Sequence, residues 1–125
     1  MNSNELIKIG FKNWYYFHEL DEYELNNKYG VYVIKLNKTF GRLQGKSDIL
    51  YIGHTTDFGV RFFKNYLNGT GGETTQRIHR YLIDKKYIDK IMISWIATQN
   101  FDLEKELREK YEKMHHEFPP WNRQK

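Results

Sequence analysis

Residues 48–67, "DILYIGHTTDFGVRFFKNYL", change character halfway along. The first part, 48–53, is a short apolar run with β-branched and aromatic residues that stops at a glycine, which is typical of a strand. The second part, 57–67, predicts a helix. Three side chains that can handle protons or phosphate surround the end of this strand: Tyr51, His54 and Arg61.

The chain on either side of this stretch predicts a small α+β sandwich. Residues 29–36, "YGVYVIKL", have the composition of a strand, and the short connection to 48–53 favours antiparallel pairing. Segment 39–47 contains two glycines and is expected to form a loop or a wide hairpin turn. Further along, we expect a helix from Thr74 or Thr75 to about Lys85, a strand at 87–98, and a last helix from near Asn100 or Asp102. The expected fold is a three-stranded mixed or antiparallel sheet flanked by helices, in the order β-β-α-α-β-α.

The domain organisation follows from length and composition. With 125 residues, the chain is expected to form one domain with a single core. Residues 1–28 are expected to form an N-terminal arm or short helix packed on the domain, and residues 29–125 the domain itself. The chain has no cysteine, which excludes disulfides and thiolate metal sites, and it has neither an apolar run of membrane-spanning length nor a signal-peptide pattern. A cytoplasmic protein without membrane contact is therefore expected.

Positive charge concentrates in the middle of the chain. Residues 29–56 carry four Lys/Arg against one Asp/Glu, whereas residues 1–28 carry three against five. The net charge of +4 is moderate, so the basic region fits either a nucleic-acid partner or an ordinary solvated surface.

Five landmarks follow one another in a fixed order: "GVY" (30–32), "YIG" (51–53), Arg61, "LEKEL" (103–107) and "PPWN" (119–122). In this order and on these expected elements, they resemble the GIY-YIG nuclease domain, which is named after its two tripeptides. The resemblance covers residues 29–122. It implies a metal-dependent endonuclease that hydrolyses DNA phosphodiester bonds.

The resemblance also implies a set of catalytic residues: Tyr32, Tyr51, Arg61, Glu104 and Asn122. His54, directly after the glycine of "YIG", departs from the family, whose members often carry lysine there, and is a further candidate. Arg61 is implied to grip phosphate oxygens, and Glu104 to hold Mg²⁺ or Mn²⁺, hard cations that prefer oxygen ligands. One tyrosine is implied to activate the attacking water while the other holds the water or the phosphate. Gly30 and Gly53 are expected to allow close backbone approach at the strand ends.

Each of these residues also has a simpler interpretation. Glu104 and Arg108 lie four residues apart, which suits a stabilising helix pair. Buried strand tyrosines usually serve packing, and a tyrosine is a poor base unless nearby cations such as Arg61 or a metal lower its pKa. A lone histidine is more often structural; because histidine exchanges protons near neutral pH, His54 is also a second candidate base, or it contacts phosphate. Asn122 would orient a phosphate or simply belong to a turn after two prolines.

DNA contacts outside the catalytic set are expected at exposed cations: Arg42, Lys46, Lys64, Arg77 and Arg80. The chain ends three residues after Asn122, so we expect no separate C-terminal DNA-recognition domain. Specificity would then come from the core, from DNA shape such as a branch, from a homodimer or from a partner protein. The alternative function is a nucleic-acid-binding module on the same fold with little or no catalysis of its own.

Overall fold

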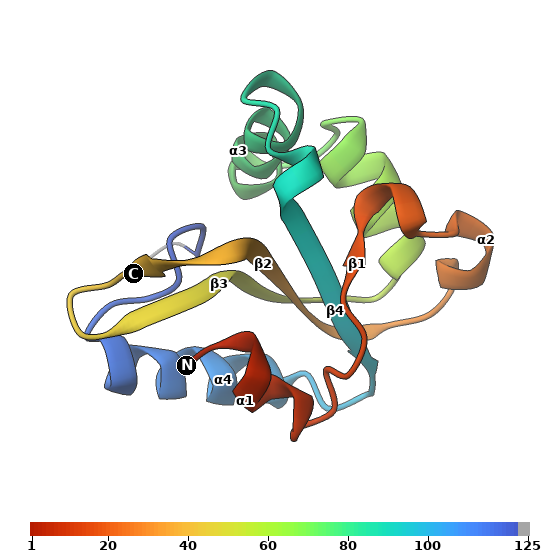
Figure 1. Ribbon diagram of the computed structural model, residues 1–125. Coiled ribbons are helices and arrows are strands. Elements are labelled where there is room, and N and C mark those ends of the chain that lie inside the picture. Colours follow the sequence, from red (N-terminus) through yellow and green to blue (C-terminus); the bar gives the residue numbers. More distant parts are fainter. Residues whose placement is uncertain (123–125) are drawn as a thin grey trace.

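A computed structural model describes residues 1–122, in which one sheet lies between two layers of helices (Figure 1). The strands are β1 (Tyr15–Tyr16), β2 (Gly30–Gly41), β3 (Lys46–Thr55) and β4 (Ile91–Ala97). Their spatial order is β1-β4-β2-β3, and every neighbouring pair is antiparallel. The predicted α+β class is confirmed.

The sheet has four strands, so the predicted number of three is wrong. The additional strand is β1, in which Tyr15 and Tyr16 pair with β4. Two residues are too few to show the alternation of apolar and polar side chains from which a strand is predicted. The N-terminal arm therefore supplies one edge of the sheet, and β3 forms the other edge.

The segment expected to be a loop, 39–47, lies mostly within a long β2–β3 hairpin. The turn itself is confined to residues 42–45, where the Arg42 amide donates to the Gly45 carbonyl at 2.9 Å. Register shifts after Ile34 and Lys35 keep the two strands paired although their lengths differ. The long insertion between the two tripeptides is therefore an extension of the hairpin.

The helices include three-residue 3₁₀ turns and two π-helical stretches. In chain order they are α1 (Ser3–Ile7), η1 (Phe17–Glu19), α2 (Glu22–Leu25), η2 (Val60–Leu67), α3 (Glu73–His79), η3 (Arg80–Asp84), η4 (Ile88–Lys90) and α4 (Asp102–His115). The expected caps at Thr74 and Thr75 are wrong, because α3 already begins at Glu73 and follows Gly72 without a side-chain cap. Within residues 1–122, no helix is both long and apolar enough to cross a bilayer.

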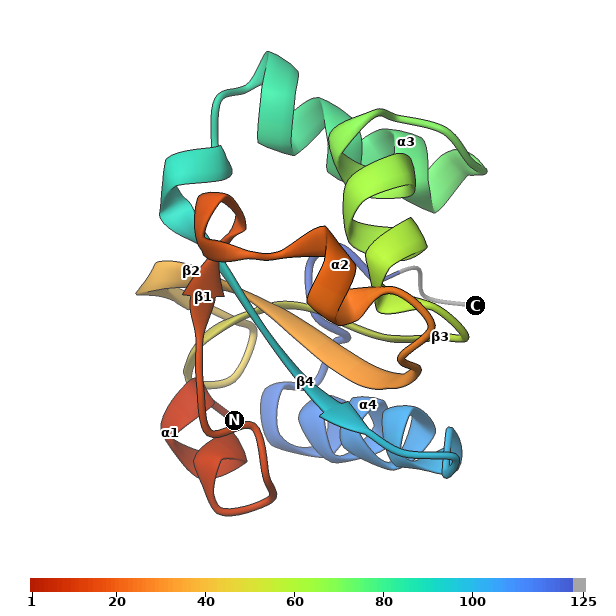
Figure 2. The same ribbon diagram turned by 90° about the vertical axis from the view of Figure 1, so that its right-hand side faces the viewer.

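The sheet separates two hydrophobic clusters. Along β2, Tyr32 and Ile34 face one cluster while Val31 and Val33 face the other, as the alternation of a strand requires. Helices η2 and α3 cover the first face, and α1 and α4 cover the second (Figures 1 and 2). Side chains from both helical layers can therefore meet at the edge strand β3.

Candidate active site

Two glycines make room for the first part of the site. In the β2–β3 register, Tyr32 lies opposite Gly53, so Tyr32, Tyr51 and Gly53 share one face of the sheet. A Cβ atom on Gly53 would lie 2.6 Å from Cε2 of Tyr51 and 2.8 Å from the Tyr32 hydroxyl. Gly30 has a φ of +156°, and a Cβ there would collide with the Ile96 carbonyl on β4. Both strand ends thus depend on residues without side chains.

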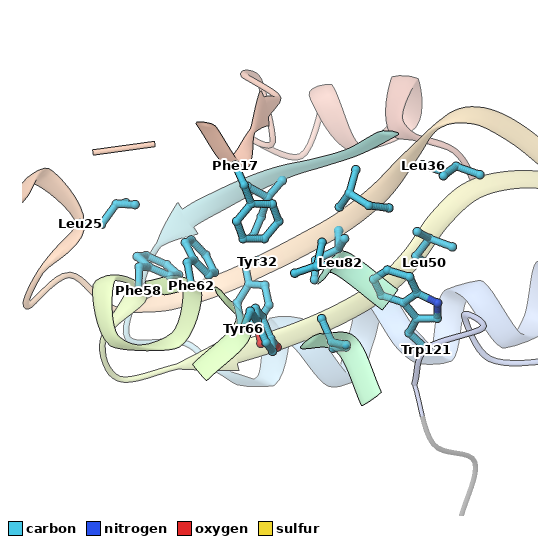
Figure 3. Packing of buried hydrophobic residues seen from close by; sticks show 14 residues of the cluster. Phe17, Leu25, Tyr32, Leu36, Leu50, Phe58, Phe62, Tyr66, Leu82 and Trp121 are labelled. Atoms are coloured by element: carbon cyan, nitrogen blue, oxygen red, sulfur yellow. The ribbon is translucent and has the colours of Figure 1, made fainter. Parts of the chain in front are cut away.

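The π-helix η2 brings Arg61 to these tyrosines together with a further one, Tyr66. Hydrogen bonds in a π-helix join residues five apart, so Arg61 and Tyr66 lie on the same side of η2. The hydroxyls of Tyr66 and Tyr32 are hydrogen-bonded, and their rings lie side by side in Figure 3. The Arg61 charge acts on both of them, and its Nε atom is buried without a hydrogen-bond partner among residues 1–122.

Burial controls the protonation of this tyrosine cluster, which consists of Tyr32, Tyr51 and Tyr66. Burial raises the pKa of Tyr32 well above its usual value of 10.0, and it also raises the pKa of Tyr66. The pKa of Tyr51 is raised by burial first and by the Glu104 charge second. Arg61 acts in the opposite direction on all three, although burial is the larger effect. The three phenols are therefore hydrogen-bond donors at neutral pH.

The carboxylate of Glu104 reaches the same edge from the opposite helical layer, in the first turn of α4. Oε1 lies 3.3 Å from Nδ1 of His54, and Oε2 lies 3.3 Å from Nη2 of Arg108. The His54 ring stacks on Phe101 with centroids 4.7 Å apart, which fixes the imidazole beside the carboxylate. Glu104 therefore forms the helix pair with Arg108 and also faces the site; the two interpretations of this residue are compatible.

Asn122 binds the backbone of β3 directly. Its Oδ1 accepts from the Ile52 amide and its Nδ2 donates to the Ile52 carbonyl, both at 2.9 Å. The neighbouring Trp121 amide donates to the Leu50 carbonyl at 2.8 Å. The C-terminal segment, residues 119–122, thus lies along the edge strand next to Tyr51, with the amide of Asn122 engaged by the protein itself.

The expected DNA-contacting cations divide into two groups. Arg42 forms an ion pair with Glu117 at 2.9 Å and donates to the Phe118 carbonyl at 2.7 Å, close to the ring of Tyr111. Tyr111 is seven residues along α4 from Glu104, about 10 Å at the rise of an α-helix. Arg42 and the neighbouring, exposed Lys46 therefore lie at the far end of the hairpin and not beside the site.

The second group lies on the helical layer that carries Arg61. Lys64 is exposed on η2, Arg77 belongs to α3, and the exposed Arg80 begins η3. The guanidinium of Arg77 donates to the Trp121 carbonyl, which connects this layer to the C-terminal segment. Of the five expected contacts, these three lie on the helical layer that supplies Arg61.

A metal would have one protein carboxylate to bind here. Within residues 1–122 there is no group of three or more His, Asp or Glu side chains suited to hold a metal ion. Glu104 alone fits Mg²⁺ or Mn²⁺ in the arrangement in which waters and a substrate phosphate complete the shell. Such an ion would replace or join the His54 and Arg108 contacts of the carboxylate.

Sequence reasoning missed Tyr66. Tyr66 follows Arg61 by five residues, whereas the helical repeat used in prediction is 3.6, which turns the two side chains to different sides. The signal that could have found it is the run of aromatic residues in 62–66, combined with the nearby Arg61.

The fold and the site define a class: a small α+β domain in which tyrosines, an arginine and a glutamate meet at one sheet edge. A family model described as "GIY-YIG catalytic domain" matches residues 28–117, and the chain belongs to that family. Membership implies nuclease-type cleavage of nucleic acid. No match was found among curated proteins or among solved structures.

Proposed function

We propose that the protein is a metal-dependent endonuclease that hydrolyses DNA phosphodiester bonds at the edge of β3. The observation that carries the proposal is the convergence of three elements on Tyr51 of β3. The charges of Arg61 from η2 and Glu104 from α4 both act on the phenol of Tyr51. A cytoplasmic location, and a homodimer or partner protein that supplies specificity, belong to the same proposal.

In this proposal, Arg61 acts as a cation and the tyrosines act as protonated phenols. Arg61 grips two phosphate oxygens through its planar guanidinium. Tyr51 and Tyr32 are protonated and therefore donate hydrogen bonds to the phosphate or the attacking water. His54 takes the proton of that water, since its ring is held beside Glu104 and a histidine can exchange protons near neutral pH.

Glu104 is the residue that would hold Mg²⁺ or Mn²⁺. When bound, the cation neutralises charge on the phosphoryl oxygens and on the leaving oxygen. Asn122 contributes by fixing the Ile52 backbone between Tyr51 and Gly53, which makes it a positioning residue in this proposal.

The test is a cleavage assay on supercoiled plasmid, a branched DNA duplex and an RNA of the same sequence, each with Mg²⁺, Mn²⁺ or EDTA. We expect cleavage of DNA with either cation, none in EDTA, and a strong loss in Arg61→Ala. Cleavage in EDTA would contradict metal dependence, and cleavage of RNA but not DNA would contradict the proposal that DNA is the substrate.

A second candidate function is a nucleic-acid-binding module without catalysis. Two observations favour it: both carboxylate oxygens of Glu104 already have protein partners, His54 and Arg108, and burial raises the pKa values of Tyr32 and Tyr51. Salt-dependent DNA binding by the wild type, with no cleavage of any substrate and no effect of Glu104→Gln on affinity, would select this function.

A further inference from the structure

A cationic hollow lies on the helical layer above the candidate site. It measures about 270 Å³ and is lined by Arg77, Arg80, Tyr81 and Lys85, which we call the basic hollow. An adjoining hollow of about 480 Å³ shares Arg77 and Arg80 with it. Together they form one depression along α3 and η3.

The basic hollow has the chemistry of a phosphate site. Three of its four lining residues are cations, and none is acidic; Glu73 lines only the adjoining hollow. Arg80 and Lys85 are exposed, whereas Nε of Arg77 is buried with no hydrogen-bond partner in the described part of the chain. Arginine offers a planar fork to phosphate oxygens, and lysine adds a point charge.

Stacking of a nucleobase fits this hollow less well than a phosphate does. The ring of Tyr81 already stacks on Trp121, with centroids 4.9 Å apart and planes at 18°. Tyr87 packs edge-on against the same ring at 6.1 Å. The aromatic surface is therefore largely committed to the protein core.

The C-terminal segment connects the basic hollow to the candidate active site. Arg77 donates to the Trp121 carbonyl, and the next residue, Asn122, holds Ile52 beside Tyr51. Two consecutive residues of this segment, Trp121 and Asn122, thus join the two places.

We infer that the basic hollow binds a backbone phosphate of the same DNA that is cleaved at the β3 edge. This inference rests on the proposed function and specifies the substrate further. Because the C-terminal segment separates the hollow from Tyr51, the bound phosphate is a different one from the scissile phosphate. Substrates that end before the bound phosphate lose this contact.

The test is the binding of a fluorescein-labelled 20-base-pair duplex in EDTA by the double variant Arg80→Ala/Lys85→Ala. We expect Kd to rise about tenfold at moderate salt and the slope of log K against log salt to fall by about 1, as the loss of one phosphate contact requires. The control Lys110→Ala/Lys113→Ala removes the same charge from exposed positions on α4 and is expected to match the wild type.

Two outcomes would overturn the inference. One is a salt slope of Arg80→Ala/Lys85→Ala equal to that of the wild type; the other is a loss of DNA affinity in the control variant as large as that in the double variant. Substrate length gives a second measurement. On a duplex that ends before the phosphate bound in the basic hollow, variant and wild type are expected to share the same KM.

Binding in EDTA separates this inference from the proposed function. If the wild type binds the duplex with a steeper salt slope than the double variant but never cleaves it, the proposed function fails, whereas phosphate binding in the basic hollow is supported. If the wild type cleaves DNA and the double variant binds as the wild type does, the basic hollow alone fails.

Discussion

At the scale of single residues, the tyrosine cluster is the feature that composition does not reveal. Tyr32, Tyr51 and Tyr66 come from two strands and a helix, and their hydroxyls interact with one another beneath Arg61. Tyr32 and Tyr51 could be predicted from the two tripeptides. Tyr66 could not, because its place depends on the π-helical conformation of η2, which local propensity does not encode.

Removing the Tyr66 hydroxyl should slow the reaction without weakening substrate binding. In Tyr66→Phe, the ring still fills its space, but Tyr32 loses the hydrogen bond that orients its own hydroxyl. We expect kcat to fall about fivefold, since one such bond corresponds to about 1 kcal/mol, while KM stays unchanged.

The matched control for this prediction is Tyr111→Phe, which removes a buried hydroxyl from the other face of the sheet. Steady-state cleavage of one duplex by both variants is the measurement. If the two variants have the same kcat, Tyr66 does not act on the site.

The raised pKa values of the buried tyrosines predict that the protein loses stability in alkali. Below pH about 10, folded and unfolded tyrosines are both protonated, so they add no pH dependence there. At higher pH, the unfolded chain releases protons that the folded chain retains, and the free energy of unfolding therefore falls as pH rises.

Urea unfolding between pH 8 and about 11.5 measures this effect. We expect a constant midpoint up to pH about 10 and a steady decline above it. Tyr66→Phe should show a shallower decline, because one group with a raised pKa is gone. If the urea midpoint of the wild type instead increased with pH beyond pH about 10, the raised pKa values of the buried tyrosines would be contradicted.

At the scale of elements, strand β3 and the C-terminal segment form one unit. Asn122 binds both backbone groups of Ile52, and Trp121 binds Leu50. These contacts join residues 70 positions apart, so no local pattern predicts them. The sequence pattern "PPWN" marks the segment but does not tell whether the amide of Asn122 faces phosphate or backbone.

The variant Asn122→Ala distinguishes these two roles. If the amide stabilises the edge strand, we expect the free energy of unfolding to fall by about 1–3 kcal/mol, the cost of leaving buried polar groups unpaired. Asn37→Ala, at an exposed position of β2, should change it by no more than about 0.5 kcal/mol. Unchanged stability with weaker DNA binding would instead assign Asn122 to phosphate.

The main elements could be predicted because their composition is distinctive. The apolar, β-branched runs of β2 and β3 and the amphipathic repeat of α4 are local signals, and the structure contains all three elements. The two-residue strand β1 and the long hairpin could not be predicted, since both depend on pairing with distant residues. Pairing energy of this kind is not visible in local propensity.

At the scale of the whole molecule, the two edges of the sheet differ in charge. Strand β1 belongs to the acidic N-terminal residues 1–28, whereas at the β3 edge the Arg61 charge acts on Tyr51 and Arg77 binds the adjoining Trp121. A polyanion is therefore expected to approach the β3 edge. The expected contact at Arg42 shows the limit of charge counting, because its partner Glu117 lies 75 positions further along the sequence.

Glu104 forms a helix pair with Arg108 and is also the proposed metal ligand. The most direct measurement is the single-turnover cleavage rate of a DNA duplex with Mg²⁺ by Glu104→Gln, compared with Glu109→Gln at an exposed position of the same helix. We predict that Glu104→Gln binds DNA with unchanged affinity but cleaves it at least about 100-fold more slowly, a barrier increase of about 2.7 kcal/mol. Glu109→Gln should cleave at the wild-type rate. Equal rates for Glu104→Gln and the wild type would contradict the assignment of this edge as the active site.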